Sequence, residues 1–189
     1  LGAGVVTAAI EIEPMAGRHV TAVRAIDELT YPTPWSVATW RNELASTDRH
    51  HVVAVADEGR DGRRVVGHAG LLFVLDEVHV TTVAVHPDVQ GRGIASRMLV
   101  ALLREARTRL VSAATLEVRA SDRRTQRLYG RFGFRPVGLR RGYYSGPTDD
   151  AVVMWLEQLG SADTETRLER IGAELDRLAP PSHVTGRTT

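Results

Sequence analysis

Residues 83–96, VAVHPDVQGRGIAS, join an apolar strand pattern to a helical pattern through Gly91 and Gly93. Apolar residues recur at helical spacing from Ile94 onward, so a helix is expected to begin at or just before Gly93. The first amides of a helix have no partner within it and carry partial positive charge, and glycine lets an anion approach the backbone closely. The spacing therefore favours a phosphate-binding loop, although strand-to-helix turns also carry glycine for structural reasons.

This loop does not fit the usual nucleotide-binding fingerprints. It lacks the third glycine of the dinucleotide motif, and no Gly-Lys-Ser or Gly-Lys-Thr follows it. Neither a Rossmann site nor a P-loop is supported.

The length, charge and composition of the whole chain limit the classes of protein to which it can belong. Its 189 residues are about one domain, and a net charge of +1 argues against a protein whose main work is to grip nucleic acid. The absence of cysteine excludes disulfides, thiolate metal sites and cysteine nucleophiles. No apolar run has membrane-spanning length, and the first residues do not resemble a signal peptide. We expect a soluble cytoplasmic protein, a monomer or weak dimer, with no direct contact to nucleic acid or membrane.

Periodicity and turn residues predict a mixed order of elements. Pro14 suits a helix start, Ser36 a helix cap and Gly133 a helix end. The candidate inner positions of the first helix include Met15, Val20, Val23, Ile26 and Leu29. Strands are expected at 8–13, 51–57, 64–74, 77–85, 114–118, 134–144 and 151–156, and helices at about 14–29, 36–44, from 94, at 125–132 and beyond 160.

This order predicts an α+β fold: a mixed, largely antiparallel sheet with helices on both faces. We expect a flexible N-terminus at 1–7, one domain at 8–159, an amphipathic helix at 160–179 and a disordered tail at 180–189. The apolar stripe of that helix fits packing on the domain or on a partner.

Several ordered motifs together resemble one family. The loop QGRGIA resembles the pyrophosphate loop of GNAT N-acetyltransferases, and PWS (34–36), LEVRASD (116–122), RLYGRFGF (127–134) and LRRGYY (139–144) are similar to RimI-type acetyltransferases. The resemblance spans roughly residues 8–157. It implies a GNAT-like fold, acetyl-CoA as acetyl donor, and acetylation of the N-terminal alanine of a ribosomal protein.

The resemblance also implies roles for individual residues. Glu117 would be the general base and Tyr129 the general acid. The family usually has asparagine at the position of Asp122, and an ionised aspartate accepts but does not donate hydrogen bonds, so we expect a weaker acetyl-CoA interaction or a changed partner there. The implied cofactor-binding residues are Val83, Ala84, Val85, Gln90, Gly91, Arg92, Gly93, Ile94, Ala95, Ser96 and Asp122.

The chemistry of acetyl transfer is consistent with these roles. Glu117 lies between Leu116 and Val118, where burial would make it a stronger base than a solvated carboxylate, although a strand glutamate is often a surface residue paired with arginine. Tyr129 is protonated at neutral pH and can donate to a thiolate, although it also suits a core position. Strand amides at 83–85 could stabilise an oxyanion.

Other side chains are candidates for lesser roles. His68, His79 and His86 are rival bases, but their positions suggest structural or solvent roles, and their spacing predicts no metal site. An aromatic wall that accepts a peptide, or one that only closes the core, is expected from Tyr31, Trp35, Tyr143 and Tyr144.

The leading hypothesis is a protein N-α-acetyltransferase that uses direct transfer in a ternary complex, because no cysteine is present to carry the acetyl group. Its partner would be the N-terminus of an acceptor protein, for example a ribosomal protein. Two alternatives stay open: a GNAT enzyme that acts on a small-molecule amine or lysine side chains, and a non-catalytic acetyl-CoA-binding module whose terminal helix engages a partner.

Overall fold

The computed structural model describes residues 9–57, 62–145 and 147–178. The expected termini at 1–7 and 180–189 lie outside these ranges. Within them, seven strands form one sheet in the order β1-β2-β3-β4-β5-β7-β6, in which the only parallel pair is β4 with β5. The strands are β1 (Ile10–Pro14), β2 (Arg49–Asp57), β3 (Arg63–Val74), β4 (Glu77–Val85), β5 (Ala113–Arg119), β6 (Arg135–Tyr144) and β7 (Asp149–Leu156). The predicted mixed, largely antiparallel sheet is confirmed.

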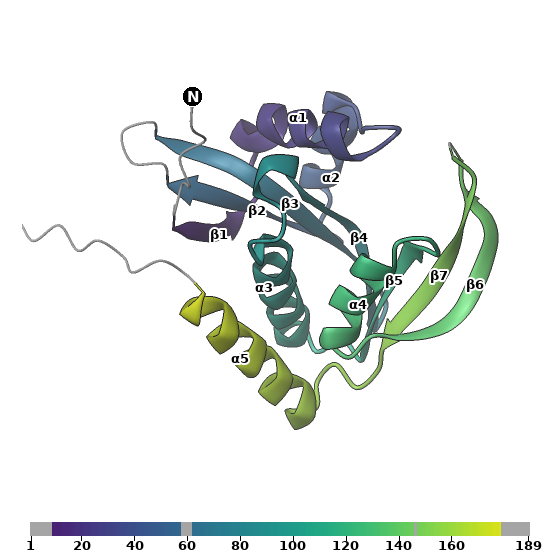
Figure 1. Cartoon of the computed structure of the whole chain (residues 1–189). Coiled ribbons are helices and arrows are strands. Elements are labelled where there is room, and N and C mark those ends of the chain that lie inside the picture. Colours follow the sequence, from purple (N-terminus) through teal and green to yellow (C-terminus); the bar gives the residue numbers. More distant parts are fainter. Residues whose placement is uncertain (1–8, 58–61, 146, 179–189) are drawn as a thin grey trace, which may run out of the picture.

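Helices cover both faces of this sheet (Figure 1). They are α1 (Val20–Thr30), α2 (Val37–Ala45), α3 (Ile94–Thr108), α4 (Arg123–Arg131) and α5 (Ala162–Arg177). Strand β2 shows how one sequence serves both layers, since alternate side chains of a strand point to opposite faces. Val52 and Ala54 join the core formed with α3, whereas Val53 and Val55 pack with Val20, Val23 and Trp40 of α1 and α2.

Local signals fix most helix ends. The Ser36 side chain accepts a hydrogen bond from the amide of Thr39 and caps α2, as the sequence predicts. Gly133 follows α4 with a φ of 97°, a left-handed conformation that suits glycine.

The predicted start of the first helix is wrong. Pro14 pairs with Val52 in the β1–β2 ladder and stays extended, and a 3-10 turn at Gly17–His19 comes before α1. Leu29 is 57% exposed, because the buried face of α1 instead carries Val20, Val23, Ile26 and Asp27.

The helix expected beyond residue 160 is α5, and it packs against α3 (Figure 1). Leu168, Ile171 and Leu175 are buried in the same core as α3. Arg97 of α3 donates to the carbonyl of Leu175 and pairs with Asp176 at 3.1 Å. Among the described residues, no helix is both long and apolar enough to cross a membrane.

Candidate active site

The cleft opens where the two parallel strands separate. β5 pairs with β4 only where Glu77–His79 face Ala113–Thr115. Beyond that point a cleft of about 1530 Å³ lies between the strands, α3, α4 and the end of α5. Every residue that the sequence analysis selected for catalysis, cofactor binding or substrate binding lines this cleft.

The backbone of β4 presents alternate groups to the cleft. The amide of His86 donates to the carbonyl of Val66 on β3, and neighbouring residues of a strand direct their amides to opposite edges. The amides of Val83 and Val85 therefore face the cleft, whereas that of Ala84 faces β3. All three residues line the cleft, and their part in binding the acyl donor stays a prediction. The carbonyl of Val83 accepts a hydrogen bond from the Tyr31 hydroxyl at 3.1 Å, and that of Val85 accepts one from the side-chain amide of Gln90 at 3.1 Å.

The glycine loop has the conformation that its sequence predicts. Gly91 and Gly93 have φ values of 81° and 77°, and Gly93 is the N-cap of α3. Residues with a Cβ rarely adopt this left-handed region. The first amides of α3 thus begin at the cleft, in a segment whose two glycines leave its backbone uncovered.

Glu117 projects into the cleft in an ionic setting. Leu116 and Val118 point to the core on the other face of β5. The Glu117 carboxylate, 10% exposed, pairs with Nε2 of His79 at 2.9 Å and with Arg140 at 3.0 Å. The apolar surroundings expected for Glu117 are therefore wrong, and its arginine partner is Arg140 on β6. Arg119 instead stacks on Tyr144, with its guanidinium 4.2 Å from the ring centre.

His79 has a definite tautomer in this arrangement. Burial lowers the pKa of His79, an effect that Glu117 opposes and Arg140 reinforces. A carboxylate only accepts hydrogen bonds, so Nε2 of the neutral ring carries the proton and donates to Glu117. Nδ1 then accepts from the hydroxyl of Thr115 at 2.9 Å. The solvent or structural role predicted for His79 is incomplete, because this ring orients the candidate base.

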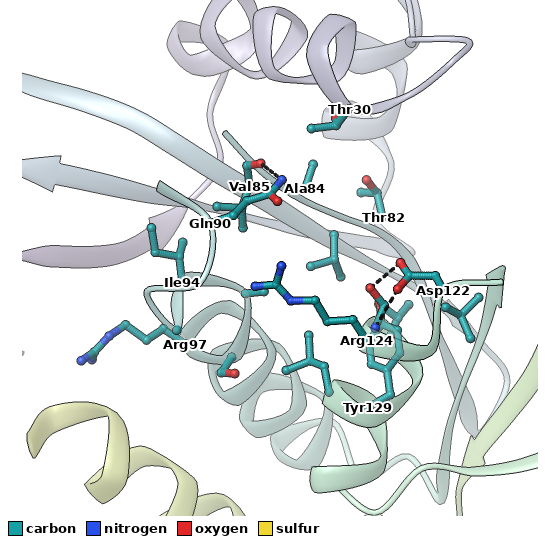
Figure 2. Close-up of a pocket in the computed structure, with 18 of the residues that line it drawn as sticks. Thr30, Thr82, Ala84, Val85, Gln90, Ile94, Arg97, Asp122, Arg124 and Tyr129 are labelled. Atoms are coloured by element: carbon teal, nitrogen blue, oxygen red, sulfur yellow. Dashed lines mark hydrogen bonds between the residues drawn. The ribbon is translucent and has the colours of Figure 1, made fainter. Parts of the chain in front are cut away.

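Tyr129 lies on α4 at the wall of the cleft (Figure 2). It is 6% exposed and packs edge to face on Phe134. Its hydroxyl makes no hydrogen bond to a described residue. Burial, reinforced by Tyr31, Tyr144 and Asp122, raises its pKa, so Tyr129 stays protonated across the physiological pH range.

Asp122 serves the helix that carries Tyr129. Its carboxylate accepts from the amide of Thr125 at 2.9 Å and from the Thr125 hydroxyl at 2.6 Å, so it caps α4 (Figure 2). This is the changed partner that the sequence analysis offered as one outcome of the replaced asparagine. Both contacts turn the carboxylate toward its own helix.

The four residues expected to form the aromatic wall differ in how firmly their side chains are held by neighbouring groups. The Tyr31 hydroxyl bonds to Thr82 at 2.9 Å as well as to Val83, and Trp35 packs on Trp40 with ring centres 4.9 Å apart. Tyr143 and Tyr144 form an edge-to-face pair on β6, and Tyr143 is 50% exposed. Tyr31 and Trp35 thus contribute to the framework of the cleft, whereas the tyrosine pair has a free surface.

The other two histidines have structural roles, as predicted. His68 is fully buried and bonds to Asp27 at 2.8 Å, and Asp27 also accepts from Trp40. The His86 ring accepts from the amide of Asp88 and caps the turn after β4. Among the described residues, no group of three or more ligand-type side chains is placed to hold a metal ion. The expectation of no metal stays a prediction.

Sequence reasoning missed four features of the site: the contacts of His79 and of Arg140 with Glu117, the position of Arg124 and the end of α5. His79 and Arg140 reach Glu117 from neighbouring strands, and Arg124 extends from α4 into the cleft (Figure 2). The end of α5 also lines it, through Glu174, Leu175, Asp176 and Leu178. A signal existed for His79, because it lies near the start of its strand as Thr115 does, and a strand-helix-strand connection predicts parallel pairing. The sequence gives no comparable signal for α5.

The parted strands β4 and β5, the glycine loop at the start of α3 and the cleft between them match the site expected of an N-acetyltransferase. The profile of the Acetyltransferase (GNAT) family matches residues 20–134, so the chain belongs to that family. The chain is 41% identical over 125 residues to the N-alpha-acetyltransferase RimI of Mycobacterium tuberculosis, covering 64% of this chain and 74% of that protein. It is 35% identical over 150 residues to the [ribosomal protein bS18]-alanine N-acetyltransferase of Salmonella typhimurium, covering 77% and 95%.

A solved structure agrees with these sequence relatives. The crystal structure of the ribosomal-protein-S18-alanine N-acetyltransferase from Escherichia coli superposes with a TM-score of 0.70 at 28% identity, covering 79% of this chain and 94% of that one. The sequence resemblance and the predicted fold are both confirmed. Helix α5 lies outside the stretch that the family profile matches.

Proposed function

We propose that this protein is an acetyl-CoA-dependent N-α-acetyltransferase that acetylates the N-terminal amine, preferably of alanine, on a ribosomal or other protein. Transfer is direct, within a ternary complex of enzyme, donor and acceptor. The names of the relatives support the acceptor class, and a ribosomal acceptor fits the expected cytoplasmic location.

The observation that carries this proposal is the shared cleft. The glycine loop, the Glu117 carboxylate and the Tyr129 hydroxyl come from three separate segments and line the same cavity. A Cβ at Gly93 would lie 2.7 Å from Leu175, so only glycine fits where the helix amides meet the cleft. The loop amides therefore suit the anionic pyrophosphate of acetyl-CoA.

Acetyl-CoA would supply an activated thioester carbonyl. Glu117 accepts a proton from the acceptor ammonium, which frees the nitrogen lone pair for attack on that carbonyl. The cleft-facing amides of Val83 and Val85 donate to the oxygen that becomes negative. As the carbon–sulfur bond breaks, Tyr129 donates its proton to the departing thiolate. The nitrogen, which still carries one proton more than the amide, returns a proton to the Tyr129 oxygen, and Glu117 releases its own proton to solvent. The neutral amide, the CoA thiol and protonated Tyr129 then remain.

The acceptor preference follows from proton affinity. An α-amino group has an ordinary pKa near 7.8, whereas that of lysine is near 10.4, so deprotonation at pH 7 costs roughly 3.5 kcal/mol less for the α-amino group. A base oriented by His79 and Arg140 suits this easier deprotonation.

The test uses acetyl-CoA and a short peptide that begins with Ala-Arg and contains one internal lysine. Mass spectrometry should locate the acetyl group on the terminal alanine. A matched peptide with a blocked N-terminus should stay unmodified. Acetyl on lysine, or preferential acetylation of an added polyamine, would move the acceptor to another amine, and binding of acetyl-CoA without turnover on any amine would support a binding module.

A further inference from the structure

One cation in the cleft has no role in holding the fold together. Arg124 is the second residue of α4, and side chains in a helix lean toward its N-terminus. The guanidinium accordingly crosses the cleft from α4 toward the glycine loop (Figure 2). A Cβ built at Gly91 would lie 3.6 Å from Nη2 of Arg124.

Three nearby arginines have partners, whereas Arg124 makes no hydrogen bond or ion pair with a described residue. Arg123 donates to the Gln126 side chain at 3.3 Å, Arg131 pairs with Glu174 at 2.9 Å, and Arg97 pairs with Asp176 at 3.1 Å. A cation in the first turn also opposes the helix dipole, so Arg124 does not stabilise α4.

Two features indicate an anion with oxygen acceptors. The loop amides that begin α3 and the Arg124 guanidinium line the same cleft, and Arg124 approaches the loop at Gly91. Guanidinium groups bind phosphate oxygens through paired hydrogen bonds, which gives both charge and orientation. Asp122, two residues away, turns its carboxylate into the α4 cap and so leaves this donor set open.

We propose that Arg124 binds the pyrophosphate of the acyl donor from the side opposite the glycine loop, and that it offsets the negative charge of Asp122 at this end of the cleft. The proposal rests on acetyl-CoA being the donor. Arg124 thus supplies from α4 a second half of the phosphate site, facing the half that the backbone of residues 91–96 supplies.

The test is calorimetric binding of CoA and of 3′-dephospho-CoA, which keeps the pyrophosphate, to the full chain. Arg124→Gln should weaken both ligands by about tenfold to hundredfold, the range expected for lost hydrogen bonds to a charged group. Arg124→Lys should recover part of this loss, because it keeps the charge without the paired geometry. Arg123→Gln removes an equal charge one residue away, outside the cleft, and should change the affinity by less than about fivefold.

Salt dependence separates phosphate contact from a general disturbance of α4. The affinity of the unmodified protein should fall with rising salt more steeply than that of Arg124→Gln, since one ion pair is missing in the variant. Circular dichroism should show the same fold for all variants, because Arg124 is exposed.

Each contrary result has a distinct meaning. Unchanged CoA affinity in Arg124→Gln, or an equal loss in Arg123→Gln, would overturn the role of Arg124 and leave the proposed function standing. A loss seen with CoA but absent with 3′-dephospho-CoA would overturn the pyrophosphate assignment in favour of the 3′-phosphate. Failure of the unmodified protein to bind CoA at all would refute the proposed function itself.

Discussion

Replacement of Gly93 by alanine should destabilise the protein for two separable reasons. Gly93 has a φ of 77°, a left-handed conformation that costs a residue with a Cβ about 1–2 kcal/mol. The new Cβ would also lie 2.7 Å from Cδ2 of Leu175 on α5, closer than carbon atoms approach in proteins.

The cost of this close contact depends on how the Leu175 side chain moves. Leu175 is 4% exposed, so its side chain has little room and must leave its preferred rotamer. A displacement of this kind costs about 0.5–1.5 kcal/mol, which gives a total loss of about 1.5–3.5 kcal/mol for Gly93→Ala. Gly91→Ala is the matched control, because φ there is 81° but the new Cβ would meet only Arg124, at an ordinary 3.6 Å.

The assay is urea denaturation of the ligand-free protein, with each glycine variant made in the Leu175 and the Leu175→Ala background. Leu175→Ala alone should cost about 2–5 kcal/mol, as for other buried leucines. In the Leu175→Ala background, Gly93→Ala should destabilise the protein only by its conformational cost, and therefore by about as much as Gly91→Ala. An equal cost for Gly93→Ala in both backgrounds would refute the contact between α5 and the glycine loop.

Three further changes test the site and its surroundings. Glu117→Gln should lower the transfer rate about 10²–10⁴-fold near neutral pH and less at high pH, where the acceptor amine is already neutral; an unchanged pH–rate profile would remove Glu117 as base. Tyr129→Phe should slow transfer by about 10²-fold or more with little change in CoA affinity, and full activity would exclude it as the acid. Burial lowers the pKa of His51 below its ordinary value of 6.5, so the unfolded chain binds the proton more tightly. The contribution of His51 to the free energy of unfolding should therefore be fully present above pH 6.5 and should decrease as the pH falls below that value. Urea denaturation at several pH values should show a smaller decrease in stability for His51→Gln than for the unmodified protein.

The sequence predicted most of the fold because its local signals agree with the tertiary structure. Ser36 and Gly93 mark helix starts through chemistry that depends on few neighbours. Pro14 failed as a marker because proline also fits the end of an edge strand, and pairing of β1 with β2 decided between the two uses. Leu29 failed because Asp27 takes an inner position through bonds to His68 and Trp40, which no apolar pattern predicts.

Many of the residues that line the cleft were predictable from motifs, but the charged groups around Glu117 were not. Glu117 is flanked by apolar residues in sequence, and the strand places those neighbours on the opposite face. Its real neighbours, His79 and Arg140, come from strands that are 38 residues before it and 23 residues after it along the chain. Only the sheet order β4-β5-β7-β6 and the reach of the arginine side chain bring them together.

The two glycines of the loop are required for different physical reasons, and this difference separates function from stability. Arg124 approaches Gly91 from α4, and Leu175 approaches Gly93 from α5. The first neighbour is a charge without a partner in the described structure, and the second is a buried apolar group. Substitution at Gly91 should therefore be felt mainly in donor binding, beyond its conformational cost, whereas substitution at Gly93 should be felt in folding even without ligand. A motif read as one phosphate loop thus combines a binding position with a packing position, and the packing position depends on a helix that the family profile does not include.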